Sequence, residues 1–525
     1  MGIEHKNKLA TKGAGITVFL AVILGIALRA YNLTGRSLWF DEAFSWRLIQ
    51  FPFSEMIQRA ATDVHPVFYY VLLKWWAFVF GPGILSLRSF SVVCAGLTVV
   101  ALYGFVSYAF QSKRAGALAS MLFAVSGWQI AFAWEARMYT LGGLLLVLSS
   151  WALLYALREK DKGVWPWITY AIVTALVLHT HYYGIFSVVA QGLFILGAII
   201  VEARGRIGEI IHSKATWHAV GALVLTGLLF APWVPTFLKQ NAQVQNKYWI
   251  PPIGGWSIPD TFVRMVAPTS GIPSHQGIGI VTSALPMFLL IVGSIFFALS
   301  CNRKSFVSGK SQTVACDAVW LVLLSAYIPF LLSISLSFIG QSLYNDRFFV
   351  FANIFILIGV AVAIAGASWV PLRRTLVACC VLGLLWTNAS YGKELDIAHR
   401  PGARGASEYI LANRASKEPV VVGSPFVYFS VLHYMNNAIA SDGPVKLYSE
   451  TGEFFHFSGG PIMTQADIVG PSVWQGDSSI VWVVDTDGFG SDSLQVPSNF
   501  KLLEERTYQE VFPHQKSVFV RKYSK

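Results

Sequence analysis

The chain consists mainly of long apolar runs separated by short polar links. Runs of about 18 or more residues recur, which is long enough for a helix to cross a bilayer. A membrane barrel would instead show short segments of alternating polarity. The pattern therefore predicts a polytopic α-helical membrane protein with about eleven spans. We expect these spans at about 16–28, 86–110, 115–132, 139–157, 165–182, 184–201, 217–236, 277–300, 318–339, 348–370 and 375–390.

Two regions depart from this pattern. Residues 33–85 are too polar for one span, and we predict an outer loop with short helices lying on the membrane, one of them over 67–80. From about residue 391 no run is long enough to span, so we predict a transmembrane domain over 1–390 and a small α/β domain over 391–525. Short apolar runs typical of strands lie at 420–422, 480–485 and 518–520.

Basic residues are concentrated in alternate links between the spans. Loops rich in Lys and Arg stay on the cytoplasmic side, so this distribution puts the N-terminus inside. An odd number of spans then puts the α/β domain on the outer, extracytoplasmic face. The basic links contain Lys113, Arg114, Arg158, Arg204, Arg206, Lys214, Arg303, Lys304, Arg373 and Arg374.

The composition agrees with a membrane protein. Of the 525 residues 54% are hydrophobic and 13% charged, whereas soluble proteins carry about a quarter charged residues. The net charge of +11 could indicate nucleic acid as a partner. The excess lies in the short links, however, and no basic helix or nucleic-acid motif is present. We therefore expect membrane lipid, and no nucleic acid, as a partner.

The polar feature of greatest interest is the pair Asp41-Glu42, which lies in the aromatic run 38–46. Carboxylates beside a membrane are costly unless they serve a function. Asp41 is therefore the candidate general base. Neighbouring residues on a helix point about 100° apart, so Asp41 and Glu42 would not act as one pair. Glu42 would orient the substrate that accepts the transferred group, or pair with a cation. The alternative for both is an ordinary solvated acid at a helix N-terminus.

Three further motifs follow the acidic pair along the chain. They are Asp-Val-His-Pro-Val-Phe-Tyr-Tyr at 63–70, Glu-Ala-Arg-Met-Tyr at 135–139 and Tyr-Asn-Asp-Arg-Phe at 344–348. In order and spacing, residues 15–390 resemble bacterial glycosyltransferase family 39-like proteins of the GT-C class. Relatives of these proteins are the protein O-mannosyltransferases and the lipid A aminoarabinose transferase.

This resemblance implies a GT-C-like fold in the bacterial plasma membrane and a polyprenyl-phosphate sugar donor used on the outer face. The acceptor would be a hydroxyl of a cell-envelope glycan, a lipid or a protein. Asp41 matches the essential acid of the family's first outer loop, and Glu42 its neighbour. The aminoarabinose transferase has a basic residue soon after its acid and a Lys before its proline stretch. Phe44, Ser45 and His65 stand at these places, which puts the aminoarabinose function in doubt.

Transfer from a lipid phosphate needs a base for the acceptor hydroxyl and cations for the departing phosphate. Arg137 and Arg347, at the outer ends of predicted spans, are the phosphate candidates with His65, and Tyr139 and Tyr70 are the substrate-binding candidates. Each has an ordinary alternative: arginines that snorkel to lipid headgroups, a loop histidine, or tyrosines of an aromatic belt.

The chemistry implied by the resemblance requires no cofactor, because the donor is already activated. We expect an inverting, metal-independent reaction. His179 and His181 are two residues apart and would face different sides of a helix, so we predict no metal site there.

The alternative function is a polytopic transporter or flippase for a lipid-linked sugar. Such proteins commonly show internal repeats and charges at mid-membrane. We find no internal repeat, and the ionisable residues collect at the ends of the spans. This distribution favours the enzyme.

Overall fold

The computed structural model describes residues 2–525 apart from 160–161, 247, 270–275, 306–312, 416, 436–444, 492 and 513–515. The chain forms two compact units. The helical unit comprises Met1–Tyr31 and Ser89–Tyr391, and the loop–sheet unit comprises Asn32–Arg88 and Gly392–Lys525.

The helical unit confirms a polytopic membrane protein. Among the described residues nine helices are long and apolar enough to cross a membrane, or ten if the bent pair α6–α7 counts as one span. The predicted span 165–182 corresponds to α9, which has only 16 residues. The long helices and their neighbours are α1 (Gly2–Ala30), α5 (Ile84–Phe110), α6 (Lys113–Val125), α7 (Gly127–Ala133), α8 (Tyr139–Arg158), α9 (Trp165–Thr180), α10 (Gly184–Glu202), α12 (Lys214–Phe230), α15 (Ile278–Ser305), α16 (Thr313–Ile339), α17 (Val350–Ala365) and α18 (Val370–Leu395).

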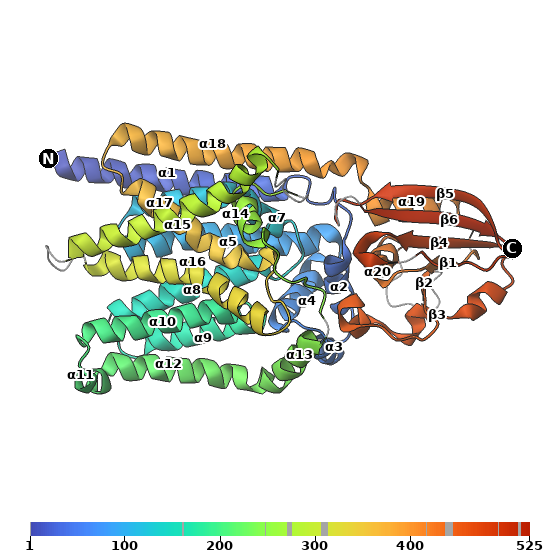
Figure 1. The fold of residues 1–525 in the computed structure, drawn as a ribbon, viewed down its shortest axis with the longest axis horizontal. Helices are drawn as coiled ribbons and strands as arrows, with labels where there is room; N and C mark the ends of the chain where they lie inside the picture. The colour runs from blue at the N-terminus through green and yellow to red at the C-terminus, as the bar shows by residue number, and fades with distance from the viewer. Residues whose placement is uncertain are drawn as a thin grey trace. The chain divides into compact units, whose positions relative to one another are not determined.

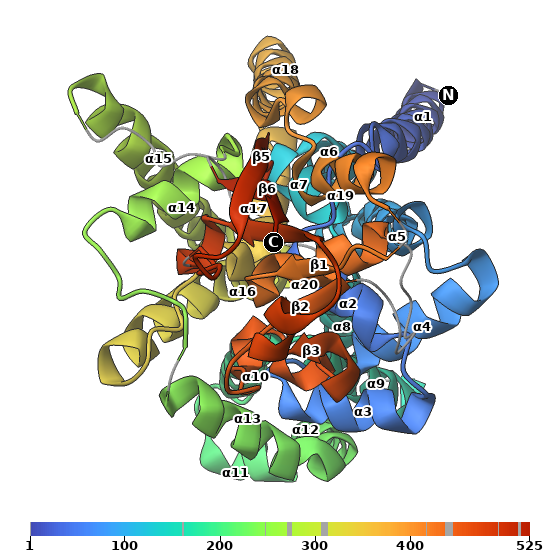
Figure 2. The ribbon, with the colours of Figure 1, turned by 90° about the vertical axis from the view of Figure 1, so that its right-hand side faces the viewer.

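These helices pack in pairs along their length. Helix α8 packs on α9, α9 on α12, α10 on α16 and α1 on α6 (Figure 1). Helices α15 and α18 lie at the rim of this unit (Figure 2). Shorter helices link the long ones: α11 (Ile207–His212), α13 (Val234–Asn246), α14 (Ser257–Val266) and the 3-10 turn η3 (Asp346–Phe349).

Glycines allow α17 to approach α8 closely. A Cβ atom added at Gly142 would lie 2.7 Å from the Phe351 ring, and one at Gly143 would lie 2.9 Å from Ile354. Real Cβ contacts are longer, so a larger residue at either position would require the Phe351 or Ile354 side chain to shift. This approach brings the start of α8, which carries Tyr139, near the segment that precedes α17.

A buried arginine stabilises the break between α6 and α7, where the chain bends by 60°. The last carbonyls of a helix have no partner within it. Arg29 of α1 donates from Nη1 to the Ala124 oxygen at 2.8 Å and from Nη2 to the Phe123 oxygen at 3.0 Å. The guanidinium thus satisfies the end of α6 and fixes α1 to it.

The loop–sheet unit begins with three short helices, as predicted for residues 33–85: α2 (Phe40–Leu48), α3 (Phe53–Thr62) and α4 (Phe68–Phe80). Its second part is a six-stranded sheet of order β3-β2-β1-β4-β6-β5 with α19 (Gly402–Asn413) and α20 (Pro425–Tyr434). The strands are β1 (Val420–Val422), β2 (Val445–Tyr448), β3 (Ile468–Val469), β4 (Ile480–Thr486), β5 (Lys501–Gln509) and β6 (Ser517–Ser524).

The sheet is mixed and has a small apolar core. Strands β1, β2, β3 and β4 pair in parallel, whereas β6 pairs antiparallel with β4 and β5. Val421, Val481 and Val483 pack there with Trp474 and Phe500. The predicted α/β fold is confirmed, and β1, β4 and β6 lie at the three predicted strands.

The acidic end of β4 is a structural turn. Asp485 accepts a hydrogen bond from Arg521 Nη1 at 2.8 Å, and Asp487 accepts one from the Ser517 amide at 2.7 Å. Burial raises the pKa of Asp485 despite this arginine. Both carboxylates therefore hold the end of β4 to β6.

The two parts of the loop–sheet unit are joined by buried polar contacts. Arg47 Nη2 of α2 lies 3.1 Å from both carboxylate oxygens of Asp467. Arg59 Nη1 of α3 donates to the carbonyls of Pro461 and Met463 at 2.9 and 3.1 Å. The sequence analysis assigns residues 33–85 to the transmembrane domain over 1–390. The limits of the two domains, 1–390 and 391–525, stay a prediction.

Candidate active site

The acidic pair lies in the first turn of α2, where the positive end of the helix dipole favours acidic residues. Trp39 precedes the helix in an extended conformation, and its ring packs edge-on against Phe512 with centroids 4.5 Å apart. Asp41 is half-buried, whereas Glu42 is completely buried. The neighbours thus have different environments, as their 100° separation on a helix predicts.

Glu42 is paired with Arg88, a residue that the sequence analysis did not single out. Arg88 Nε and Nη2 lie 2.8 and 2.7 Å from the two Glu42 oxygens. Arg88 also donates to the carbonyls of Leu33, Arg36 and Ser37 at 2.7, 3.0 and 3.2 Å. Bidentate pairs of this kind are strong and directional. Among the two options from the sequence, these contacts favour pairing with a cation; a direct catalytic role for Glu42 stays a prediction.

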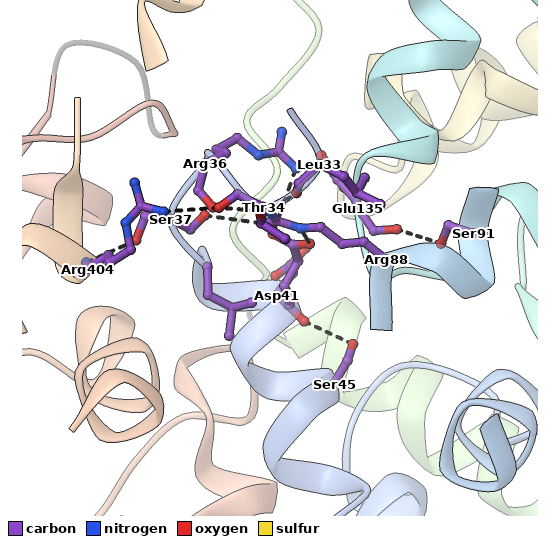
Figure 3. A network of polar contacts seen from close by, with 12 residues as sticks. Leu33, Thr34, Arg36, Ser37, Asp41, Ser45, Arg88, Ser91, Glu135 and Arg404 are labelled. Carbon is purple, nitrogen blue, oxygen red and sulfur yellow. Dashed lines mark hydrogen bonds and ion pairs between the residues drawn. The ribbon is translucent and has the colours of Figure 1, made fainter. Parts of the chain in front are cut away.

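Arg404 extends this network from α19. Its amide donates to Ser37 Oγ at 3.2 Å, and its Nη1 donates to the Thr34 carbonyl at 3.0 Å (Figure 3). The segment that leads into α2 is therefore held by arginines from two other parts of the loop–sheet unit. The signal in the sequence for Arg88 is a charged residue inside an apolar run, which is costly unless it is paired.

Helix α20 packs on α2 and covers the acidic motif. The His433 ring meets Trp46 edge-on with centroids 4.8 Å apart, and the Tyr434 hydroxyl accepts a hydrogen bond from the Leu38 amide at 2.7 Å. Burial and, to a lesser extent, the charge of Arg88 lower the pKa of His433 from 6.5 to about 4, against the opposing effect of Glu42.

This histidine predicts a loss of stability in mild acid. Below pH 6.5 the unfolded chain binds a proton that folded His433 takes up only near pH 4. Stability therefore falls as the pH drops from about 6.5 to about 4, by about 3 kcal/mol at one pKa unit per 1.36 kcal/mol. Thermal unfolding of purified protein across this range should show a flatter pH dependence for His433→Phe.

His399→Gln, which removes an exposed histidine of the same unit, is the matched control. Equal pH dependence of His433→Phe and wild type would contradict the prediction.

His65 and Tyr70 also belong to the loop–sheet unit. His65 Nδ1 lies 2.9 Å from Asp63 Oδ2, a contact that fixes the orientation of the ring. Tyr70 is buried on α4, with its ring centroid 6.3 Å from that of Phe44 and 5.5 Å from that of Tyr69. Tyr70 of α4 thus packs near Phe44 of α2, the helix that also carries Asp41.

The remaining predicted site residues, Arg137, Tyr139 and Arg347, lie in the helical unit. Arg137 is only 2% exposed. The Tyr139 ring packs against Phe132 and His181 with centroid distances of 4.9 and 5.8 Å. Tyr139 is therefore held in an aromatic cluster at the start of α8.

Arg347 lies in η3, whose first turn is capped by the Asn345 side chain. Its guanidinium carbon lies 5.5 Å from the centroid of Trp249, a cation–π distance. The neighbouring Phe348 ring lies 5.3 Å from His181, which also contacts Tyr139. The Tyr139 and Arg347 segments, distant in sequence, thus share one aromatic cluster.

His181 serves in this cluster as an aromatic residue. Its Nδ1 accepts a hydrogen bond from the Tyr183 amide at 3.1 Å, whereas His179 Nε2 lies 3.2 Å from the Leu229 carbonyl. The two rings therefore have separate environments. Within the described ranges no group of three or more His, Cys, Asp or Glu side chains is placed to hold a metal ion.

The comparison with solved structures decides the fold. ArnT from Cupriavidus metallidurans in its apo state matches with a TM-score of 0.59 at 12% identity, over 97% of this chain and 98% of that one. The chain has a GT-C glycosyltransferase fold. The GT-C resemblance that the four motifs indicated is thereby confirmed at the level of the fold.

A second ArnT structure from the same organism, bound to undecaprenyl phosphate, matches with a TM-score of 0.57 at 12% identity over 98% of both chains. The archaeal oligosaccharyltransferase AglB from Archaeoglobus fulgidus is a more distant likeness, with a TM-score of 0.46 at 12% identity over 90% of this chain and 69% of that one. No protein-family profile and no curated protein sequence matches this chain.

Proposed function

We propose that this chain is an integral-membrane glycosyltransferase that moves a sugar from a polyprenyl-phosphate donor to a hydroxyl acceptor. The observation that carries the proposal is the likeness over almost the whole chain to ArnT, which was solved with undecaprenyl phosphate bound. The acidic motif after the first helix supports it, because the transfer of a sugar to a hydroxyl needs a general base.

In this proposal Asp41 removes the proton from the acceptor hydroxyl. Its carboxylate lies at a helix N-terminus among aromatic rings and is half-buried, so it is partly desolvated yet accessible. Glu42 has a holding role, because its two oxygens are bound by Arg88. A single carboxylate base, with no covalent sugar–enzyme intermediate, corresponds to an inverting reaction.

Arg137, Arg347 and His65 are the proposed donors to the phosphate, whose negative charge increases as the sugar leaves. Arginine suits this role because it stays charged and offers a planar set of donors. Tyr139 and Tyr70 are proposed to contact the substrate. The reaction needs no cofactor, since the phosphate is an activated leaving group.

The basic links support an N-terminus in the cytoplasm and a C-terminal part on the extracytoplasmic face. This orientation gives the enzyme access to lipid-linked rather than nucleotide-linked sugars. The acceptor is then a glycan, lipid or protein of the cell envelope, in the plasma membrane of a bacterium.

Mass spectrometry of envelope glycans, lipids and proteins from a deletion strain tests the proposal. We expect one sugar modification to disappear on deletion and to return with wild type. A full set of modified products in the deletion strain would contradict the proposal, whereas transport of the lipid-linked sugar by purified protein without sugar transfer would support the flippase alternative.

A change at Arg347 tests the phosphate role. Arg347→Gln should raise the KM for the lipid-linked donor about tenfold or more, since a charge-assisted hydrogen bond contributes about 1.5–3 kcal/mol. Steady-state kinetics in membranes measures this change. Lys214→Gln, which removes one charge from an exposed link elsewhere, is the control. An unchanged KM in Arg347→Gln would remove Arg347 from the phosphate site.

A further inference from the structure

A hollow of about 1230 Å³ lies within the helical unit, away from every predicted site residue. Its walls come from α1, the α5–α6 turn, α6, the end of α17 and α18. In Figure 2 α18 stands apart from the other helices at the rim of this unit. The volume exceeds the roughly 300–1,000 Å³ of a usual small-molecule pocket.

The hollow has one charged end. Lys113 and Arg114 at the start of α6 and Arg373 and Arg374 near the start of α18 all line it. Arg373 Nη1 is anchored on the Ala367 carbonyl at 3.0 Å. Among the residues that the structure describes, no carboxylate forms an ion pair with these four side chains. Four cations are therefore concentrated on one opening.

Beyond this charged end the walls on α6 and α18 are apolar. On α6 the wall continues through Ala117 and Leu118 to Met121, and on α18 it extends to Leu382. At 1.5 Å per residue the wall is about 12 Å deep on α6 and about 14 Å on α18. This depth is close to half of the roughly 30 Å hydrocarbon core, that is, to one leaflet.

We propose that this hollow binds an anionic phospholipid of the membrane. The phosphate headgroup lies among the four cations, and an acyl chain fills the space between α6 and α18. Charge complementarity selects an anionic over a zwitterionic headgroup, and the depth matches an acyl chain in its own leaflet. The proposal requires only that the chain spans the membrane, and does not depend on the sugar-transfer activity.

Native mass spectrometry of the full-length protein tests this site. The protein is released from bilayers of equal phosphatidylglycerol and phosphatidylcholine. We expect retained phosphatidylglycerol in wild type and about a thirtyfold lower retention in Arg373→Gln/Arg374→Gln, at roughly 1 kcal/mol for each of the two basic residues. Arg373→Lys/Arg374→Lys, which keeps both charges, should retain the lipid.

Two control variants separate this site from general lipid binding. Arg206→Gln/Lys214→Gln removes two charges from an exposed link elsewhere in the helical unit and should retain the lipid. Ala378→Trp fills the apolar wall without touching a charge and should lower retention, whereas Val220→Trp, exposed on α12, should not.

If Arg373→Gln/Arg374→Gln does not insert into the membrane, the comparison of Ala378→Trp with Val220→Trp still tests the proposal. Equal retention by Ala378→Trp and Val220→Trp would overturn the proposal. Equal retention of phosphatidylcholine, or a preference for undecaprenyl phosphate over phosphatidylglycerol, would also overturn it.

Discussion

Asp41→Asn is expected to abolish sugar transfer while the protein still inserts and folds. The amide has almost the shape of the carboxylate, so the packing of α2 is kept, but it does not accept the acceptor's proton. Loss of a general base typically lowers the rate by about 10²–10⁴-fold. The measurement is the amount of sugar-modified product in a deletion strain that expresses the variant at wild-type level.

Glu55→Gln is the matched control for this change. It makes the same replacement of carboxylate by amide on the neighbouring helix α3, where the exposed Glu55 pairs with Arg59 of its own helix in an i,i+4 contact. We expect wild-type amounts of product from it. Wild-type amounts of product from Asp41→Asn would reject Asp41 as the base and leave the fold assignment intact.

Most of the helical unit could be predicted because a span is a local property of the sequence. A run of 18 or more apolar residues is readable without knowledge of its neighbours. The predicted span 165–182 shows the limit of this reasoning: α9 ends at Thr180 after 16 residues. The break between α6 and α7 was not predicted, because the carbonyls there are satisfied by Arg29, which is 95 residues away from Ala124.

The sheet was predicted where burial is continuous. Strand β4 is buried at nearly every position, and the apolar run 480–485 predicts it. Strand β5 was missed because its residues are mostly exposed, so it has no apolar run. Its place at the sheet edge is set by pairing with β6, which a local pattern does not show.

The surroundings of the acidic motif could not be predicted for the same reason. Asp41 and Glu42 were identified, but the partners of α2 come from distant parts of the chain: Arg88 lies 46 residues from Glu42, and Asp467 lies 420 residues from Arg47. These contacts indicate a role for the C-terminal part. With α20 packed on α2 and Asp467 bound to Arg47, it holds the helix that carries Asp41.

The ion pair between Glu42 and Arg88 should be the most sensitive point of the loop–sheet unit. Both side chains are completely buried, and removal of one partner from a buried pair costs about 3–5 kcal/mol. Arg88→Met leaves the Glu42 carboxylate without this partner. It also takes a donor from the carbonyls of Leu33, Arg36 and Ser37, and each unsatisfied buried group costs about 1–3 kcal/mol.

We therefore expect Arg88→Met to lower the Tm of the purified protein and its amount in membranes severely. The double variant Glu42→Gln/Arg88→Met should recover part of the stability, because it removes the buried charge that has lost its Arg88 partner but does not restore a donor to the three carbonyls. Arg506→Gln is the control: its pair with Glu504 is exposed, and exposed pairs contribute only about 0–1 kcal/mol. If Arg88→Met unfolds at the Tm of Arg506→Gln, the Glu42–Arg88 pair does not hold α2, and another contact must position Asp41.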